Sequence, residues 1–498
     1  MASFTHMSTL VGGDLTHMSG ISRLKIVNWN GTDVLYSGSF SDGGLNVFSL
    51  AAGQKATFLD QIGYSLHRGT AGLSDFDVLE VAGQPILVPS GRYDDRTAIH
   101  RLDATGAFES VKTLGANTQF IGNFSDAITI TIEGKTFMAA AQSGQSGFRS
   151  FRIRDDLSLE VKAKFEDTSS AFTGDISAMS EAQVGGRSFF FAASALDAGV
   201  TSYWMGKWGN IKERDSVAPD DGPGFNAPST LATTISDGKI YLLMGAAGTD
   251  SITSIRVNQF GGLFIEDHVM DSGATRFANI AALETFETAD RSFVLAGGSD
   301  DGLSLFELFP GGKLFHLASI ADDNATSLTN VSAIAADVIG NEVQVFASGE
   351  GAPGITQFSV DLGNLATPVL GSDQADNLTG GAGDDLLMGF DQADTLGGGD
   401  GADILVDGAG VDILSGGAGA DVFVFVADGR LDRITDFEDG IDRIDLSDLP
   451  MLYAAASLDI TPQSYGAMIR FGAERLRVET MDGQMLGLED LTDDDFIF

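Results

Sequence analysis

Apolar and polar positions follow one repeating plan through residues 1–365 of the chain. In each unit, a continuous apolar strand leads into a Gly/Ser/Asp-rich turn and then into a strand of alternating polarity. The units begin 52, 51, 52, 52, 52 and 50 residues apart. They occupy residues 34–50, 86–102, 137–153, 189–205, 241–257, 293–308 and 343–360. This regular spacing predicts a single repeat domain.

Each unit has room for four strands. A further strand precedes each segment and ends in a turn such as 81–84, and a fourth, such as 159–165, follows most of them. Four strands at a period near 50 residues are typical of β-propeller blades, and seven units fill a closed ring. We therefore predict an all-β chain that begins with a seven-bladed β-propeller in residues 1–365. An open β-solenoid is the alternative, although 50 residues are long for a solenoid coil.

Two segments are candidates for the outer strand that completes the ring. Before the first full blade, residues 5–8 (Thr-His-Met-Ser) and 16–19 (Thr-His-Met-Ser) repeat each other, and part of this stretch is one candidate. Residues 363–370, after the last blade, are the other.

The pattern changes to a nine-residue period between residues 371 and 424. Six nonapeptides each carry Asp at the sixth position and an apolar residue at the eighth. The apolar residues are Leu378, Leu387, Leu396, Leu405, Leu414 and Phe423. The pattern matches the established repeat G-G-x-G-x-D-x-U-x of calcium-binding parallel β-helices. A flexible Gly/Asp-rich linker is the alternative, but a linker has no reason to keep an apolar residue at every ninth position.

The residue types suit a calcium site for separable reasons. Glycine permits positive φ angles and lets carbonyl oxygens turn toward a cation, while aspartate adds the hard oxygen that Ca²⁺ prefers. The apolar residue points from a short strand into the core. The predicted metal ligands are Asp376, Gly380, Gly381, Gly383, Asp385, Asp394, Gly398, Gly399, Gly401, Asp403, Asp412, Gly416, Gly417, Gly419 and Asp421.

The six repeats are not equivalent. The second, fourth and sixth keep all their glycines, whereas the first and third have Gln374 and Gln392 in place of the third glycine, and the fifth begins with Asp407. Two nonapeptides make one coil, so alternate repeats share an edge. We expect the edge of Asp385, Asp403 and Asp421 to bind calcium tightly and the other edge to bind it weakly or with fewer ions.

The segments after the repeats extend the likeness to a known family. Residues 421–425 (Asp-Val-Phe-Val-Phe) are followed by 432–437 (Asp-Arg-Ile-Thr-Asp-Phe) and 440–447 (Gly-Ile-Asp-Arg-Ile-Asp-Leu-Ser), and the chain ends in three aspartates and Phe-Ile-Phe. Residues 366–498 thus resemble the RTX family of secreted, calcium-binding proteins, with a capping segment and a terminal secretion signal. The resemblance implies export by a type I ABC transporter of a Gram-negative bacterium.

Composition agrees with an extracellular protein. Residues 1–20 contain no Lys or Arg and no apolar run long enough for a signal-peptide core. There is no cysteine for disulfides and no stretch approaching the roughly 18 apolar residues of a membrane span. A formal net charge of −41 argues against binding nucleic acid or anionic membranes. Acidic solvation and calcium neutralisation both account for this charge.

Calcium is also expected to control folding of the repeats. Stacked carboxylates repel one another, and a glycine-rich segment loses much conformational entropy when it folds. An ion that binds only the folded state stabilises it by about 2.7 kcal/mol for each site at a hundredfold excess over Kd. Low cytosolic calcium would then keep residues 371–498 unfolded for export, and extracellular calcium would fold them.

The sequence says less about the propeller. Its blades resemble lactonase-type propellers in architecture, which does not fix function. Acids recur between the second and third strands of the units, where they form either ordinary turns or a ligand-binding rim; they are Asp42, Asp94, Asp95, Asp197, Asp250, Asp300, Asp301 and Glu350. The predicted channel residues are Asp75, Asp77, Asp126, Asp175, Asn279 and Asn330. The six histidines show no metal-site spacing, and Tyr203, Trp204 and Trp208 are either a sugar platform or packing residues.

Two classes of function follow. The first is a secreted calcium-binding protein that displays its propeller for extracellular binding, adhesion or surface assembly, with a cell-surface or extracellular polymer as ligand. The second is a secreted lactonase- or esterase-like hydrolase with a metal in the propeller channel. The symmetry of the blades and the lack of a catalytic motif favour the first.

Overall fold

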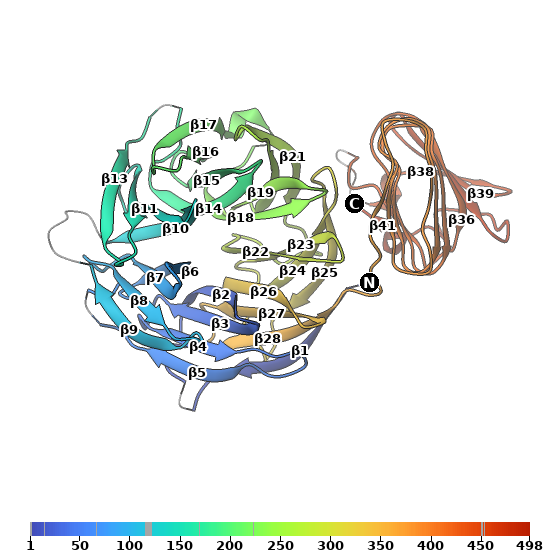
Figure 1. Ribbon diagram of the computed structural model, residues 1–498. Helices are drawn as coiled ribbons and strands as arrows, with labels where there is room; N and C mark the ends of the chain where they lie inside the picture. The colour runs from blue at the N-terminus through green and yellow to red at the C-terminus, as the bar shows by residue number, and fades with distance from the viewer. Residues whose placement is uncertain are drawn as a thin grey trace. The chain divides into compact units, whose positions relative to one another are not determined.

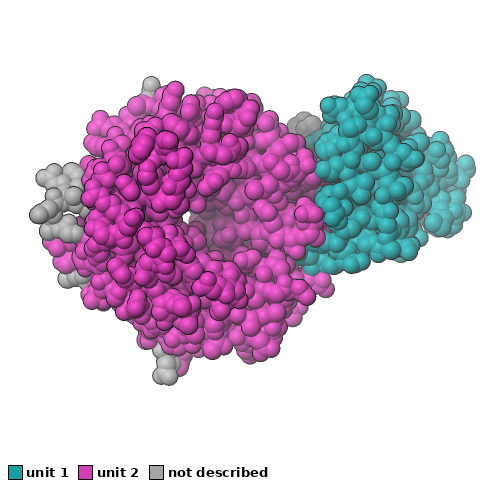
Figure 2. Space-filling model, in the orientation of Figure 1, with its two compact units in different colours: residues 1, 362–498 teal, residues 2–361 magenta. Residues whose placement is uncertain are grey.

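The computed structural model describes residues 2–13, 15–65, 67–114, 122–168, 170–222, 224–449, 452 and 454–498. These residues form two compact units, 2–361 and 362–498 (Figure 1; Figure 2). Among the described residues there is no α-helix. Three short 3₁₀ helices occur, η1 (Pro219–Asp221), η2 (Ala455–Ser457) and η3 (Asp493–Asp495).

The first unit is a ring of seven four-stranded antiparallel sheets, which confirms the predicted propeller (Figure 1). Each of the first six blades takes its strands from one continuous segment, ordered from the centre outward. Blades one to three are β2 (Ile21–Trp29), β3 (Thr32–Ser39), β4 (Leu45–Ser49) and β5 (Thr57–Ile62); β6 (Leu73–Val81), β7 (Gln84–Gly91), β8 (Ala98–Leu102) and β9 (Phe108–Thr113); β10 (Phe124–Ile132), β11 (Lys135–Gln142), β12 (Phe148–Ile153) and β13 (Leu159–Phe165). Blades four to six are β14 (Ile176–Val184), β15 (Arg187–Ser194), β16 (Gly199–Met205) and β17 (Ile211–Val217); β18 (Pro228–Ser236), β19 (Lys239–Ala246), β20 (Ser251–Val257) and β21 (Leu263–Met270); β22 (Ala282–Thr288), β23 (Arg291–Gly297), β24 (Gly302–Leu308) and β25 (Leu314–Ala321).

The seventh blade joins the two ends of this unit. It contains β26 (Val331–Ile339), β27 (Glu342–Gly349) and β28 (Ile355–Asp361), with β1 (Ser3–Leu10) as its outer strand. β1 runs antiparallel to β28, so that Ser3 lies opposite Asp361 and Leu10 opposite Ile355. Of the two candidates for the closing strand, the N-terminal one is therefore used. Residues 363–370 instead contain β29 (Val369–Leu370), which pairs within the second unit.

A serine on a β-bulge links each of six blades to the next. The bulge interrupts the register of the innermost strand, for example between Pro228 and Thr230, and Ser229 is the extra residue at that point. The Ser229 hydroxyl donates to the carbonyl oxygen of Ile280 in the following blade at 2.6 Å. The equivalent serines are Ser22, Ser74, Ser125, Ser177 and Ser332, and the sixth blade has Ala281 at this position.

The second unit is a two-sheet solenoid followed by a cap. One sheet contains six parallel strands: β29, β31 (Leu386–Met388), β33 (Ile404–Val406), β35 (Val422–Val424), β37 (Arg443–Asp445) and β41 (Phe496–Ile497). The other contains β30 (Asn377–Thr379), β32 (Thr395–Asp400), β34 (Ile413–Ala418), β36 (Leu431–Phe437), β40 (Glu474–Thr480), β39 (Gly466–Phe471) and β38 (Asp459–Gln463). β40 is parallel to β36, whereas β39 is antiparallel to both β40 and β38.

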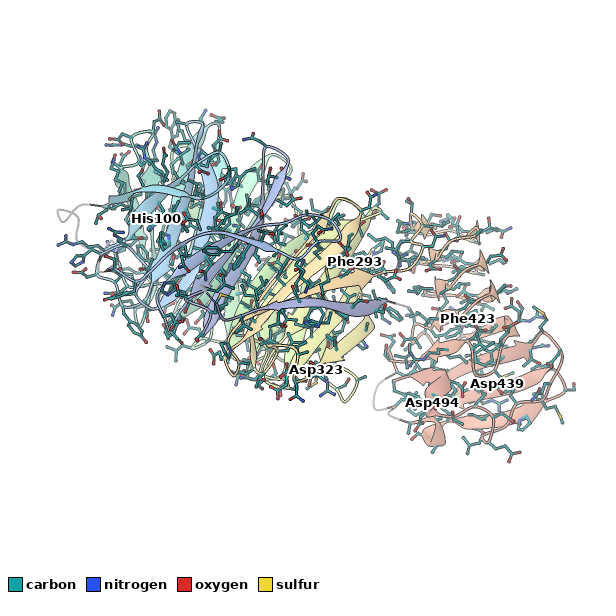
Figure 3. The ribbon with its side chains drawn as sticks, turned by 90° about the horizontal axis from the view of Figure 1, so that it is seen from below. His100, Phe293, Asp323, Phe423, Asp439 and Asp494 are labelled. Atoms are coloured by element: carbon teal, nitrogen blue, oxygen red, sulfur yellow. The ribbon has the colours of Figure 1, made fainter. Side chains whose placement is uncertain are left out.

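The register confirms that two nonapeptides make one coil. Leu378 pairs with Leu396 and Leu396 with Leu414, each 18 residues apart. On the other sheet, Leu387 pairs with Leu405 and Leu405 with Phe423. These apolar residues are buried in one core, in which Phe423 has no exposed surface (Figure 3). The terminal residues 491–498 fold into this unit as η3 and β41.

Candidate metal centre and propeller channel

Aspartates form a hydrogen-bonded ladder along each edge of the solenoid. The Asp403 carboxylate accepts the backbone N–H of Asp385 at 2.9 Å, and the Asp421 carboxylate accepts that of Asp403 at 2.9 Å. On the other edge, Asp394 accepts from Asp376 and Asp412 accepts from Asp394, at 2.7 and 2.6 Å. In every case the acceptor is Oδ1, which leaves Oδ2 for another partner.

The ladders continue beyond the nonapeptides. Asp432 accepts the N–H of Asp412 at 2.9 Å, and Asp442 accepts that of Asp421 at 3.0 Å. The sequence did not mark these two residues as ligands, because they follow their partners by 20 and 21 residues instead of 18. Their place in the capping segments, each just before or within a strand of the next coil, was the available signal.

In the middle of each ladder, the second carboxylate oxygens are buried and have no hydrogen-bond partner. These atoms are Oδ2 of Asp394 and Asp412 on one edge and of Asp403 and Asp421 on the other. Burial is the main cause that raises the pKa of Asp403 to about 6 and the pKa values of Asp412 and Asp421 to about 7. Buried, unpaired carboxylate oxygens are costly unless a cation or proton balances them. The donor set is therefore suited to Ca²⁺, which takes six to eight oxygen ligands.

The first glycine of the repeats makes room for these carboxylates. A Cβ at Gly398 would come within 2.1 Å of Asp403 Oδ2, and one at Gly416 within 2.2 Å of Asp421 Oδ2. At Gly380 the corresponding distance to Asp385 Oδ2 is 2.5 Å. A substitution at these glycines would thus displace the aspartate five residues later.

The second and third glycines serve the backbone turn. In the fourth and sixth repeats φ is positive at Gly399, Gly401, Gly417 and Gly419. Gly381 and Gly383 of the second repeat are outside this conformation. In the third repeat, Phe390 and Gln392 adopt φ of 71° and 75°, so the turn is kept there without glycine at some cost in strain.

In the propeller, the recurring acids hold turns together. Asp250 accepts the N–H of Asn279 at 2.5 Å, and Asp301 accepts that of Asn330 at 2.8 Å. Asp197 does the same for Gly174 at 2.6 Å, and Asp42 for Ser19 at 3.2 Å. Each acid ties the turn after the second strand of a blade to the turn that enters the innermost strand. This pattern favours turn chemistry over a ligand-binding rim.

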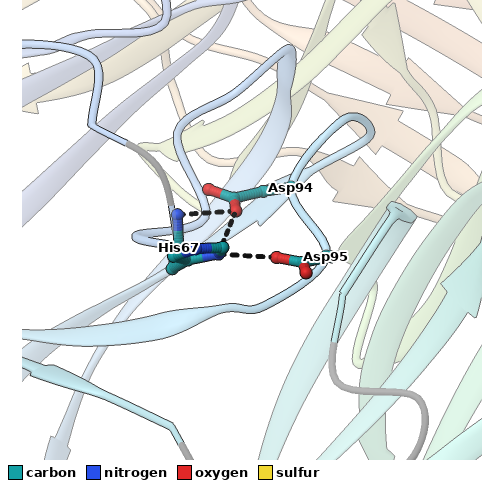
Figure 4. A group of neighbouring side chains, drawn as sticks. All are labelled: His67, Asp94 and Asp95. Atoms are coloured by element: carbon teal, nitrogen blue, oxygen red, sulfur yellow. Dashed lines mark hydrogen bonds and ion pairs between the residues drawn. The ribbon is translucent and has the colours of Figure 1, made fainter. Parts of the chain in front are cut away.

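One rim position also includes a histidine. His67 Nδ1 lies 2.6 Å from Asp95 Oδ1, and the His67 backbone N–H donates to Asp94 (Figure 4). The Asp94 carboxylate also accepts the N–H groups of Arg68 and Gly69. The oxygens of Asp94 are therefore already hydrogen-bonded to the backbone of residues 67–69. Sequence spacing did not reveal this group because His67 belongs to the turn before the blade and the acids to a turn within it.

The centre of the propeller holds a charged cavity of about 250 Å³, seen as a hollow in the ring in Figure 2. Of the predicted channel residues, Asp75 and Asp77 line it, and Asp126 is buried beside Asp75. The other three were placed wrongly. Asp175, Asn279 and Asn330 lie in turns with φ of 52°, 48° and 54°, a conformation that Asn and Asp tolerate better than most residues.

Salt bridges between blades line this cavity. Arg23 lies 2.9 Å from Asp75, and Lys25 lies 2.5 Å from Asp77. Glu181 lines the cavity with an exposed side chain, and partial desolvation by the surrounding protein raises its pKa to about 7. In the described part of the chain, three Asp, Glu or His ligand atoms come within 4.8 Å of one another at two places, the His67 group and Asp407–Asp412–Asp432. Neither is in the channel.

Two of the three aromatic residues of the fourth blade are packed against protein. Tyr203 is buried and stacks on Phe190, with ring centroids 5.0 Å apart, and Arg214 covers the ring of Trp204. Trp208 is 66 % exposed, with Lys135 lying 3.9 Å from its ring centroid. These contacts favour packing over a sugar-binding platform for Tyr203 and Trp204. No helix in the described residues is long and apolar enough to cross a membrane.

Comparison with known proteins bears on the second unit. No curated protein matches the chain. Residues 357–467 match the family described as Peptidase M10 serralysin C terminal, beginning within β28 and extending through the repeats into the cap. The solenoid, with its aspartate ladders and paired nonapeptides, is thus similar to the C-terminal domain of that RTX-type family, and the match does not extend to residues 1–356 or 468–498.

Proposed function

We propose that this is a secreted calcium-binding protein whose solenoid folds on extracellular Ca²⁺ and which displays its propeller for binding to a cell surface or extracellular polymer. The main support is the set of buried Oδ2 atoms without partners on Asp394, Asp403, Asp412 and Asp421. Calcium would take these oxygens and the carbonyl oxygens of the glycine turns as ligands. The similarity to the serralysin C-terminal domain supports the same conclusion.

A calcium titration of the full chain tests the folding switch. All three tryptophans, Trp29, Trp204 and Trp208, belong to the propeller, so tryptophan fluorescence reports on that unit alone. Far-UV circular dichroism reports on both units. We expect calcium to change the dichroism and to protect residues 362–498 from proteolysis while the fluorescence stays constant. A solenoid that is fully protected in chelator, with no bound calcium, would contradict the proposal. Magnesium at equal concentration is the control.

Export through a type I ABC transporter is proposed from the resemblance of residues 491–498 to family signals. The test is coexpression with such an exporter in a Gram-negative host. We expect the intact chain in the medium and a chain lacking residues 491–498 in the cells. Equal export of both chains would contradict this route.

The propeller is proposed to bind rather than to catalyse. Two of its channel acids, Asp75 and Asp77, form salt bridges between blades with Arg23 and Lys25, and this arrangement favours structural packing. The test is esterase and lactonase assay of the wild type and of Asp126→Asn. Activity lost in that variant without a change in tryptophan fluorescence would support the hydrolase instead.

A further inference from the structure

One repeat departs from the rule at the first position. In the other five repeats this position is Gly371, Gly380, Gly389, Gly398 or Gly416. A Cβ there would approach Oδ2 of the aspartate five residues later, to within 2.1–2.5 Å at four of them and 3.1 Å at Gly371. The fifth repeat has Asp407, whose own carboxylate therefore enters the space beside Asp412.

Three carboxylates from two successive coils meet at this point. Asp407 follows β33, Asp412 precedes β34, and Asp432 lies in β36. One oxygen of each lies within 4.8 Å of the others, and their side chains are 0, 1 and 5 % exposed. Because Ca²⁺ binds oxygen at about 2.4 Å, ligands on opposite sides of one ion are about 4.8 Å apart. The group is therefore compact enough to surround a single ion.

The hydrogen bonds leave oxygens free for that ion. Asp407 Oδ1 accepts the N–H groups of Val426 and Gly408, at 2.9 and 2.5 Å. Asp407 Oδ2 and Asp412 Oδ2 are buried without any partner. None of the ion pairs between described residues involves Asp407, Asp412 or Asp432. Asp407 Oδ2 and Asp412 Oδ2 are thus two buried, negatively charged oxygens in neighbouring carboxylates, and no ion pair with a protein cation balances them.

We propose that Asp407, Asp412 and Asp432 form a side-chain calcium site where the repeats meet the cap, in which Asp407 and Asp432 add their carboxylates to that of Asp412. It lies on the edge whose repeats have lost glycines, and Asp407 supplies there a charged oxygen that no other repeat has at its first position. The inference rests on the proposed calcium function of the solenoid. On the edge of the first, third and fifth repeats, which the sequence predicts to bind calcium weakly, the strongest site would therefore be the one next to the cap.

The test compares Asp407→Asn with the wild type in the full chain. Asparagine keeps an oxygen that accepts the Val426 and Gly408 N–H groups but removes the charge. We expect calorimetric titration with CaCl₂ to show the loss, or a weakening of on the order of tenfold or more, of one ion. In chelator, however, the variant is expected to unfold at a higher temperature than the wild type, because one of three repelling carboxylates is gone. A purely structural aspartate would not give these opposite effects.

Two further variants complete the experiment. Asp432→Asn is expected to affect the same ion, and it provides the answer if Asp407→Asn does not fold. Asp373→Asn removes an exposed acid of the first repeat and is the control for net charge. Equal calcium binding by wild type, Asp407→Asn and Asp432→Asn would overturn the inference while leaving the proposed function intact. A wild type that binds no calcium would overturn the proposed function itself.

Discussion

The hydroxyl of Ser229 donates a 2.6 Å hydrogen bond to the carbonyl oxygen of Ile280, the residue that leads into the next blade. Ile280 is completely buried, so its carbonyl oxygen has no water to replace this donor. The same bond recurs at Ser177 and Pro228. These serines fasten neighbouring blades near the centre of the ring, where the innermost strands converge.

Removing one of these serines is expected to weaken the propeller. Ser229→Ala should lower the free energy of unfolding by about 1 kcal/mol, since a buried acceptor loses its donor. Denaturation followed by tryptophan fluorescence measures this effect. Ser110→Ala, at an exposed position of β9, is the matched control. Equal midpoints for both variants would show that the inter-blade bond contributes nothing.

The sixth blade offers the opposite change. Ala281 occupies the position equivalent to Ser229 there, and its N–H donates to the carbonyl oxygen of Gly297 at 3.0 Å. Ala281→Ser would direct a hydroxyl toward the carbonyl of Val331 in the seventh blade. We expect a gain of about 0.5–1.5 kcal/mol, the usual net value of one hydrogen bond. An unchanged or lower midpoint in the same assay would contradict this expectation.

A buried ion pair in the sixth blade should be sensitive to the loss of one partner. Arg291 binds Glu307 through two hydrogen bonds of 2.6 Å, and the side chains are 3 and 1 % exposed. Glu307→Ala would remove the carboxylate that balances a buried cation and is expected to cost about 3–5 kcal/mol. The double variant Arg291→Met with Glu307→Leu should recover much of that loss. If the double variant is no more stable than Glu307→Ala, charge burial is not the cause.

The two edges of the solenoid should differ in calcium affinity. Asp403→Ala removes a ligand from the edge with complete glycines, and Asp394→Ala removes one from the edge with Phe390 and Gln392. We expect the larger loss of calcium affinity from Asp403→Ala, measured by titration of the full chain. Equal losses would mean that the kept backbone turn at Phe390 compensates for the missing glycines.

Acidity should act in opposite directions with and without calcium. Burial raises the pKa of Asp412 and Asp421 to about 7, above the value near 4 of an unfolded chain. Between these values the folded calcium-free chain holds more protons, so its free energy of unfolding falls as pH rises from about 4 to 7. Calcium displaces those protons, so the loaded chain gains stability over the same range. Thermal unfolding at pH 5 and 7.5, in chelator and in calcium, measures both slopes. Parallel slopes would exclude carboxylate ligands.

Sequence periodicity was sufficient for the architecture because each blade and each coil repeats its own apolar pattern. Periodicity was not sufficient for contacts between residues whose separation in the sequence differs from the repeat length. Asp432 and Asp442 belong to the ladders but stand outside the nine-residue spacing, since the capping segments carry extra residues. Asp407 looked only like a missing glycine, because its proximity to Asp432 depends on how successive coils stack. The bulge serines look like ordinary turn residues until the register of the innermost strands is known.

The pairing of β1 with β28 closes the ring of blades, and it joins strands from the two ends of the propeller sequence. Ser3 lies opposite Asp361, so one of the earliest residues and the last residue of the propeller must be present together. Until β1 pairs with β28, the seventh blade has only the three strands β26, β27 and β28. Closure is then a late folding step that spans nearly the whole propeller sequence, and such long-range pairing is slow. An incomplete propeller would keep one open sheet edge, which is a site for pairing with other chains.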